Sequence, residues 1–168
     1  METKQQVSPL PSQWQLLQIY HYRDGSLYYN SSGKGRKLFR PVGCKSHSGR
    51  KTYNTKGQTT GVHRIIFKMF YGTEPAIIDH INGNNLDNRI ENLRAATTET
   101  NGYNRKLNTT NKLGIKNVCY KASEQIYRVT ISINQKQREI FRTKDLELAE
   151  LVAIEAREKY HGKYARHV

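Results

Sequence analysis

The stretch "AIIDHINGNNLDNRIENLRAATTETNGYNR", residues 76–105, holds one histidine and seven asparagines behind a short apolar run. Asparagine side chains compete with the backbone for hydrogen bonds, so this density is typical of turns and helix caps. The stretch also joins an acid to its histidine, as Asp79-His80. Carboxylate and amide oxygens are the ligands of hard metal ions. The residues alone therefore fit either a capped turn with a buried acid-histidine pair or a site for an oxygen-seeking ion.

The local pattern of this stretch predicts two strands and a helix. The letters "IIDH" at 77–80 predict a strand, "NGN" at 82–84 a turn, and "NLRAAT" at 92–97 the returning strand. The threonines that follow can cap a helix whose opening turns contain Asn101. A β-β-α hairpin of this kind would bring Asn101 to Asp79-His80.

The chemistry that suits these side chains is metal-assisted cleavage of a phosphodiester bond. Asp79 and the amide oxygen of Asn101 are hard donors that suit Mg²⁺ or Mn²⁺. His80 could take a proton from the attacking water, because the ordinary pKa of histidine lies near 6.5. Asn92 is better placed to pin the loop that carries His80 than to touch the ion. We expect Asp79 and Asn101 to bind the metal and His80 and Asn92 to serve catalysis.

These letters resemble a known family. The segments "HRIIF", "IIDHINGNNLDNRIENLRAAT" and "NGYN" are similar to the HNH (ββα-metal) endonuclease superfamily, in its homing-endonuclease-like phage branch, over residues 62–105. The resemblance implies a metal-dependent endonuclease that cuts DNA, of homing or nicking type. It makes His80 the general base and Asn92 the central asparagine. Asn101 stands where many members have a second histidine, which makes this chain an HNN variant.

The charge of the chain points to a polyanionic partner. Lys and Arg number 28 against 14 Asp and Glu among 168 residues, a formal net charge of +14. Residues 34–56 hold eight basic residues and no acid, which favours a surface that contacts double-stranded DNA. No apolar run approaches the length that spans a membrane, and the first residues lack the core of a signal peptide. We expect an intracellular monomer, cytoplasmic in a host cell if a phage encodes it, with no small-molecule cofactor.

The residues before the quoted stretch predict hairpins and one helix. Aromatic runs on both sides of Asp24-Gly25 predict a hairpin over residues 16–29, and "YNTKGQTTGV" predicts a second hairpin through Lys56-Gly57. The letters "HRIIFKMFYG" at 63–72 predict a short helix, with His63 in a structural role. The expected buried face of that helix is Ile65, Ile66, Met69 and Phe70.

A different pattern follows the polar segment "KLNTTNK". Three short strands within residues 115–141 precede a helix from about 145 to 160. We predict an α+β protein with a nuclease domain at 1–107, a linker at 108–112 and a second domain at 113–168, a three-stranded antiparallel sheet packed on one helix. The expected apolar stripe of that helix is Ala149, Val152, Ala153, Ala156 and Tyr160.

The second domain also resembles a known family. The segments "NKLGIKNV", "YRVTI", "FRT" and "HGKYA", within residues 111–165, are similar to the AP-two domain, the DNA-binding domain of plant ethylene-response factors. That resemblance implies a sheet whose polar face enters a major groove. Arg94 in the first domain is a further candidate for a phosphate contact. From the resemblance and the strand alternation together, the expected DNA-binding residues of the sheet are Lys116, Lys121, Arg128, Thr130 and Arg138.

Two other functions stay open from the sequence. One is a non-catalytic DNA-binding regulator whose hairpin is only a scaffold, and the other is an RNA-binding protein. Metal-dependent nicking of plasmid DNA separates the nuclease from the regulator. Competition between duplex DNA and duplex RNA separates the RNA-binding protein from both.

Overall fold

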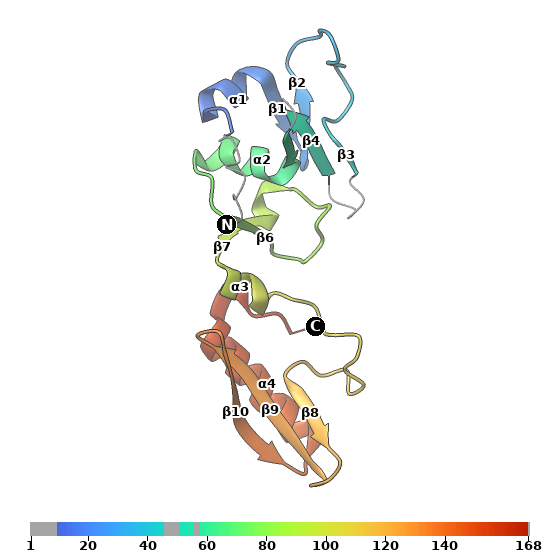
Figure 1. Cartoon of the computed structure of the whole chain (residues 1–168), viewed down its shortest axis with the longest axis vertical. Coiled ribbons are helices and arrows are strands. Elements are labelled where there is room, and N and C mark those ends of the chain that lie inside the picture. The colour runs from blue at the N-terminus through green and yellow to red at the C-terminus, as the bar shows by residue number, and fades with distance from the viewer. Residues whose placement is uncertain (1–9, 46–50, 56–57, 168) are drawn as a thin grey trace, which may run out of the picture. The chain divides into compact units, whose positions relative to one another are not determined.

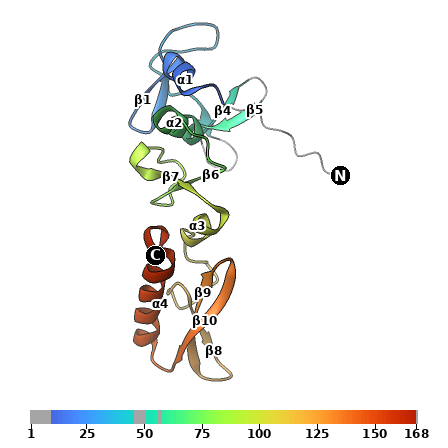
Figure 2. The same ribbon diagram turned by 90° about the vertical axis from the view of Figure 1, so that its left-hand side faces the viewer.

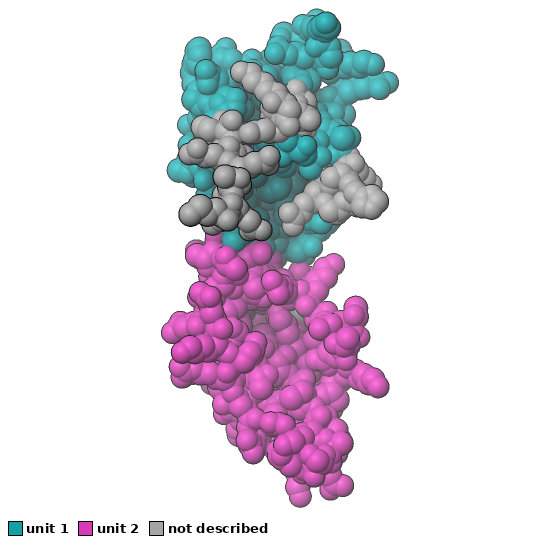
Figure 3. Space-filling model, viewed as in Figure 1, with its two compact units in different colours: residues 1–95 teal, residues 96–168 magenta. Residues whose placement is uncertain are grey.

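The computed structural model describes residues 10–45, 51–55 and 58–167. Its packing divides the chain into two compact units, residues 1–95 and residues 96–168 (Figure 3). Each unit has its own buried apolar cluster. Helices and small antiparallel sheets alternate along the chain (Figure 1), so the predicted α+β class is confirmed.

The first unit combines short helices with two-stranded and three-stranded sheets. Strand β1 pairs with β2, the order β3-β4-β5 forms a second sheet, and β6 pairs with β7. Strand β7 ends one residue beyond the first unit. The elements are α1 (Gln13–Ile19), β1 (Tyr20–Arg23), β2 (Ser26–Tyr29), β3 (Cys44–Lys45), β4 (Lys51–Thr55), β5 (Gln58–Gly61), α2 (Val62–Tyr71), β6 (Ile77–His80), the 3₁₀ turn η1 (Ile90–Asn92) and β7 (Leu93–Ala96).

The first predicted hairpin is present but shorter than expected. Its turn is Asp24-Gly25, where both residues have positive φ. The prediction of a strand from residue 16 was wrong, because residues 13–19 form α1. Ser12 and Gln15 build a capping box in which each side chain meets the backbone N–H of the other residue. That box starts a helix even before a β-favouring aromatic run.

The second predicted hairpin is present in its strands. Strands β4 and β5 pair antiparallel, with Thr55 opposite Gln58. The predicted turn residues Lys56 and Gly57 lie outside the described residues.

Helix α2 forms where the sequence predicted it and ends at Gly72, which takes the left-handed conformation that favours glycine. Ile65, Ile66 and Met69 are buried as expected. Phe70 is 46% exposed, so its predicted burial was wrong. The core position belongs to Phe67, which is one helical turn before Tyr71 and packs against that ring.

The second unit is a three-stranded antiparallel sheet with a long helix along one face (Figure 2). Val129 and Ile131 are fully buried, and Val129 packs with Ala149 and Ala153 of α4, whose small side chains allow close approach. This confirms the predicted sheet and C-terminal helix. The elements are α3 (Thr98–Tyr103), β8 (Val118–Lys121), β9 (Ile126–Ile133), β10 (Lys136–Thr143), α4 (Leu146–His161) and η2 (Gly162–Tyr164).

The last turns of α4 bury polar side chains where the sequence predicted an apolar stripe. Tyr160 is 43% exposed, whereas Arg157 and His161 are buried. Arg157 donates to the Lys116 carbonyl at 2.6 Å, and His161 Nε2 donates to the Ser132 carbonyl at 2.9 Å. Backbone carbonyls thus accept hydrogen bonds from both of these buried side chains.

Helix α3 packs with the second unit. Tyr103 stacks on His161 with ring centroids 3.6 Å apart. Glu99 accepts hydrogen bonds from the Tyr103 hydroxyl at 2.5 Å and from the Gln135 N–H at 3.0 Å. The predicted division into domains at 1–107 and 113–168 stays a prediction, since a functional domain need not coincide with a packing unit.

A pair of isoleucines tests the core of the first unit. Ile66 is fully buried and Ile81 is 44% exposed. We expect Ile66→Ala to lower the free energy of unfolding by about 2–5 kcal/mol through lost burial and a cavity. Ile81→Ala should cost less than about 1 kcal/mol. Urea denaturation of both variants measures the difference, and equal costs would contradict the assigned core.

Candidate active site

The predicted acid-histidine pair lies at the end of β6. Asp79 and His80 are both buried, and Ile78 anchors the strand in the core of the first unit. The Ile81 N–H donates to the Asn92 carbonyl at 2.9 Å and so joins the two ends of the loop between β6 and β7. The predicted hairpin is therefore present, and its histidine is the last residue of β6 before the loop.

The side chain of Asn92 closes this loop. Its Oδ1 accepts from the Asn82 N–H at 2.9 Å, and its Nδ2 donates to Asn82 Oδ1 at 3.0 Å and to the Asp87 carbonyl at 2.7 Å. These contacts are the pinning that the sequence suggested for Asn92. Any further part of Asn92 in catalysis stays a prediction.

Asp87 adds a second set of contacts inside the same loop. Its carboxylate accepts from Arg89 Nε at 2.9 Å, from Arg89 Nη2 at 2.8 Å and from Asn82 Nδ2 at 2.8 Å. The hydrogen bond from the Arg89 side chain is the main reason that the pKa of Asp87 lies well below its usual range. The loop is thus held by a charge that persists over the whole neutral range.

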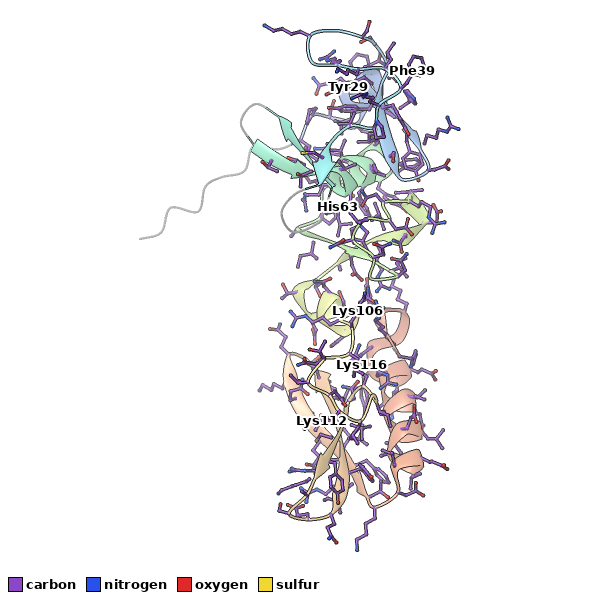
Figure 4. All side chains as sticks on the ribbon, turned by 90° about the vertical axis from the view of Figure 1, so that its right-hand side faces the viewer. Tyr29, Phe39, His63, Lys106, Lys112 and Lys116 are labelled. Atoms are coloured by element: carbon purple, nitrogen blue, oxygen red, sulfur yellow. The ribbon has the colours of Figure 1, made fainter. Side chains whose placement is uncertain are left out.

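His80 is oriented by a residue that the sequence reasoning missed. Its Nε2 lies 2.9 Å from Oδ1 of Asn88, which is buried. The ring of His63, at the start of α2, lies 5.3 Å from the His80 ring and is also buried (Figure 4 labels His63). A Cβ at Gly61 would lie 2.4 Å from an atom of that His63 ring, so a larger residue there would displace the ring. His63 thus packs beside His80.

Asp79 carries a cationic partner. Arg94 Nε and Nη2 donate to its Oδ2 at 2.9 and 2.7 Å, and both side chains are largely buried. The sequence suggested Arg94 as a phosphate contact, and in the structure it pairs with Asp79. A DNA contact by Arg94 stays a prediction.

The donor chemistry at Asp79 fits a hard cation. The described part of the chain contains no cluster of three or more His, Cys, Asp or Glu residues that could hold a metal ion. Mg²⁺, however, is commonly bound by one or two carboxylates together with water and substrate phosphate oxygens. Asn101, the other predicted ligand, lies on α3 in the second unit, so its approach to Asp79 stays a prediction.

The predicted DNA-binding residues of the second unit divide between two faces of the sheet. Arg128 and Thr130 alternate with the buried Val129 and Ile131, so they lie on the face opposite α4. Lys121 shares that face because it follows Cys119, the partner of Arg128, by two residues. We call this the open face. It carries acids too, since Arg128 pairs with Glu139 at 3.2 Å and Lys121 pairs with Glu124.

Arg138 and Lys116 have other surroundings. Arg138 stands opposite Ile131, so it lies on the side of the sheet that carries α4. Lys116 donates to the carbonyls of Tyr103 and Arg105, both at 2.8 Å, and its position is labelled in Figure 4. Burial, reinforced by the neighbouring Arg157, lowers the pKa of Lys116 to about 8. Lys116 therefore caps the end of α3, and a DNA contact by either residue stays a prediction.

Comparison with known proteins agrees with this hairpin. Residues 60–103 match the family model described as HNH endonuclease, which covers α2, β6, β7 and α3. Residues 60–103 are therefore an HNH endonuclease family domain, which supports a nuclease-type function. The described residues include no helix with the length and apolarity to cross a membrane.

Two viral proteins are similar over most of their length. Protein 3.8 of Escherichia phage T7 is 32% identical over 121 residues, which cover 70% of this chain and 98% of that protein. Uncharacterized HNH endonuclease L560 of Acanthamoeba polyphaga mimivirus is 28% identical over 156 residues, 84% of this chain and 81% of that protein. No solved structure matches the chain. The chain belongs to the same family as Protein 3.8.

The loop network predicts a measurable cost at Asn92. Asn92→Ala removes three part-buried hydrogen bonds made by one buried amide, so we expect a loss of about 1–3 kcal/mol in the free energy of unfolding. Asn85→Ala, in the same loop, should change it by less than about 0.5 kcal/mol. Thermal denaturation monitored by circular dichroism provides the comparison. An unaffected Asn92→Ala variant would show that the pinning contacts contribute nothing.

Proposed function

We propose that this protein is a metal-dependent DNA endonuclease that hydrolyses phosphodiester bonds, of homing or nicking type. The observation that carries the proposal is the buried Asp79-His80 pair at the end of β6, inside the segment that matches the HNH endonuclease family. Its relatives are viral, so we place its action in the cytoplasm of an infected cell. We propose that it acts as a monomer.

In the proposed cleavage reaction, the residues of the hairpin and of α3 have separate roles. Asp79 and Asn101 would hold Mg²⁺ or Mn²⁺, which supplies stabilisation of the charge that develops on phosphoryl and leaving oxygens. His80 takes the proton from the attacking water. Asn92 keeps the loop closed so that His80 holds one position. Arg94 balances the charge of Asp79.

The first unit supplies a basic surface for the phosphate backbone. The loop after β2 is exposed from residue 31 to residue 41 and contains Lys34, Arg36, Lys37 and Arg40 without an acid. Lys37 and Arg40 border a hollow of about 210 Å³. Phe39 extends from the same loop and is almost fully exposed (Figure 4). Cations around an exposed ring suit a surface that follows nucleic acid.

One observation favours a second candidate function. The ion pair between Arg94 and Asp79 gives the proposed metal-binding carboxylate a structural partner. A hairpin stabilised in this way could serve as the scaffold of a non-catalytic DNA-binding regulator.

Cleavage of plasmid DNA decides between the two functions. We expect the protein to nick or linearise supercoiled plasmid with Mg²⁺ or Mn²⁺ and to stop when a chelator is added. His80→Ala should reduce the rate by about 10²- to 10⁴-fold, the usual contribution of a general base, with DNA affinity within a few-fold. His21→Ala, at an exposed histidine of β1, is the matched control and should cut normally. Binding without cleavage by the wild-type protein would favour the regulator.

The two faces of the second sheet give a matched test of DNA docking. If the open face contacts DNA, Arg128→Gln should reduce the slope of log K against log salt by about 0.9, the value of one phosphate contact. Arg138→Gln removes the same charge from the side of the sheet that carries α4, and its slope should fall only if that side contacts DNA as well. Salt titrations of duplex binding measure both. A change in Arg138→Gln alone would place the DNA on the other face.

A further inference from the structure

The His80 imidazole has a buried amide partner whose role the cleavage chemistry has not yet used. Asn88 is 1% exposed, and its Oδ1 lies 2.9 Å from His80 Nε2. Its Nδ2 is buried, and none of the described residues gives it a hydrogen-bond partner. Such an unsatisfied group costs about 1–3 kcal/mol, so an apolar residue would be the more stable choice for packing alone. A side chain kept at that cost indicates a function for its oxygen.

The position of Asn88 is fixed from a segment far away in the sequence. The Ile90 N–H donates to the Tyr22 hydroxyl at 3.1 Å, which ties the loop to strand β1. At the hairpin turn, a Cβ on Gly25 would lie 2.8 Å from the Arg89 nitrogen and 3.0 Å from the Asn88 carbonyl carbon. The first hairpin therefore rests directly on the backbone that carries Asn88. Contact with this hairpin thus restrains the backbone from which the Asn88 amide reaches His80.

The contact also selects one tautomer of the imidazole. An amide oxygen can only accept a hydrogen bond. In this contact the proton must therefore be carried by His80 Nε2. A neutral imidazole protonated at Nε2 has its lone pair on Nδ1. Only the nitrogen with the lone pair can take a proton from water.

We propose that Asn88 is a positioning residue that holds His80 with Nε2 protonated, so that Nδ1 is the atom that accepts the proton of the attacking water. The proposal rests on the endonuclease function above. It adds a residue outside the Asp-His-Asn set and links the first hairpin to the general base. The hairpin, Asn88 and His80 then form one chain of contacts, in which a displacement at one end misorients the base at the other.

The test combines NMR with kinetics on the full-length protein. Long-range ¹H–¹⁵N correlation, at a pH above the ordinary pKa of histidine, reports which ring nitrogen of His80 carries the proton, with the signal assigned by its loss in His80→Ala. We expect the Nε2–H tautomer in the wild-type protein. An Nδ1–H tautomer would overturn the proposal, whether or not the protein cuts DNA. Absence of cleavage with the expected tautomer would instead contradict only the endonuclease function.

Three variants separate positioning from packing. Asn88→Leu keeps a similar volume but removes the acceptor, and we expect kcat to fall about 10- to 100-fold with KM for duplex DNA unchanged and a mixture of tautomers. Asn88→Asp keeps the acceptor and should keep both the Nε2–H tautomer and most of kcat. Asn85→Leu makes the same substitution in the same loop, at a residue outside the proposed set, and should behave as wild type. Wild-type kcat and tautomer in Asn88→Leu would overturn the proposal; if that variant does not fold, loss of the tautomer in Asn88→Asp would do so.

Discussion

The closed loop between β6 and β7 is the constraint on which the rest of the site depends. One amide, that of Asn92, bonds to the start of the loop at Asn82 and to its far side at Asp87. Eleven residues separate His80 from Asn92, and a segment of that length whose only regular element is the short 3₁₀ turn η1 would otherwise sample many conformations. Side-chain hydrogen bonds replace the missing backbone ladder. The asparagines of this stretch therefore hold the loop together as well as surrounding the site.

This arrangement explains why a polar loop can carry buried chemistry. Buried polar groups are tolerated when they have hydrogen-bond partners. In this loop Asn82 bonds to Asp87 and Asn92, and Asn88 bonds to His80. Apolar support comes from beneath, through Ile78 and Leu93 in the two strands. The core fixes the strands, the amides fix the loop, and the loop fixes the histidine.

Sequence patterns predicted most of the architecture because the strong signals are local. The alternation of apolar and polar residues predicted β9, the threonine cap predicted the start of α3, and the Asp-Gly turn predicted the first hairpin. Helix α1 was not predicted, because the aromatic residues that follow favour a strand, whereas the capping box of Ser12 and Gln15 starts a helix.

The errors that remained concern contacts between distant residues. Phe70 and Tyr160 lie on the predicted helical faces but at their edges, where the neighbouring element decides burial. The burial of Arg157 and His161 could not be predicted, because only the fold brings the accepting backbone carbonyls next to them. Asn88 looked like one turn-forming amide among seven, and its contact with His80 depends on a hairpin some sixty residues earlier. Spacing along the chain contains no trace of such a contact.

Under the proposed function, the distribution of charge suits the two units to different parts in binding DNA. No acidic residue lies between Asp24 and Glu74, so the cations of that long segment attract phosphate without local competition. On the open face of the second sheet, Glu124 and Glu139 engage Lys121, Arg128 and Arg142. Paired cations add little to long-range attraction, but their positions are fixed, and fixed side chains are what base readout needs. Under the proposed function, general affinity for DNA should therefore come mainly from the first unit and any sequence preference mainly from the second.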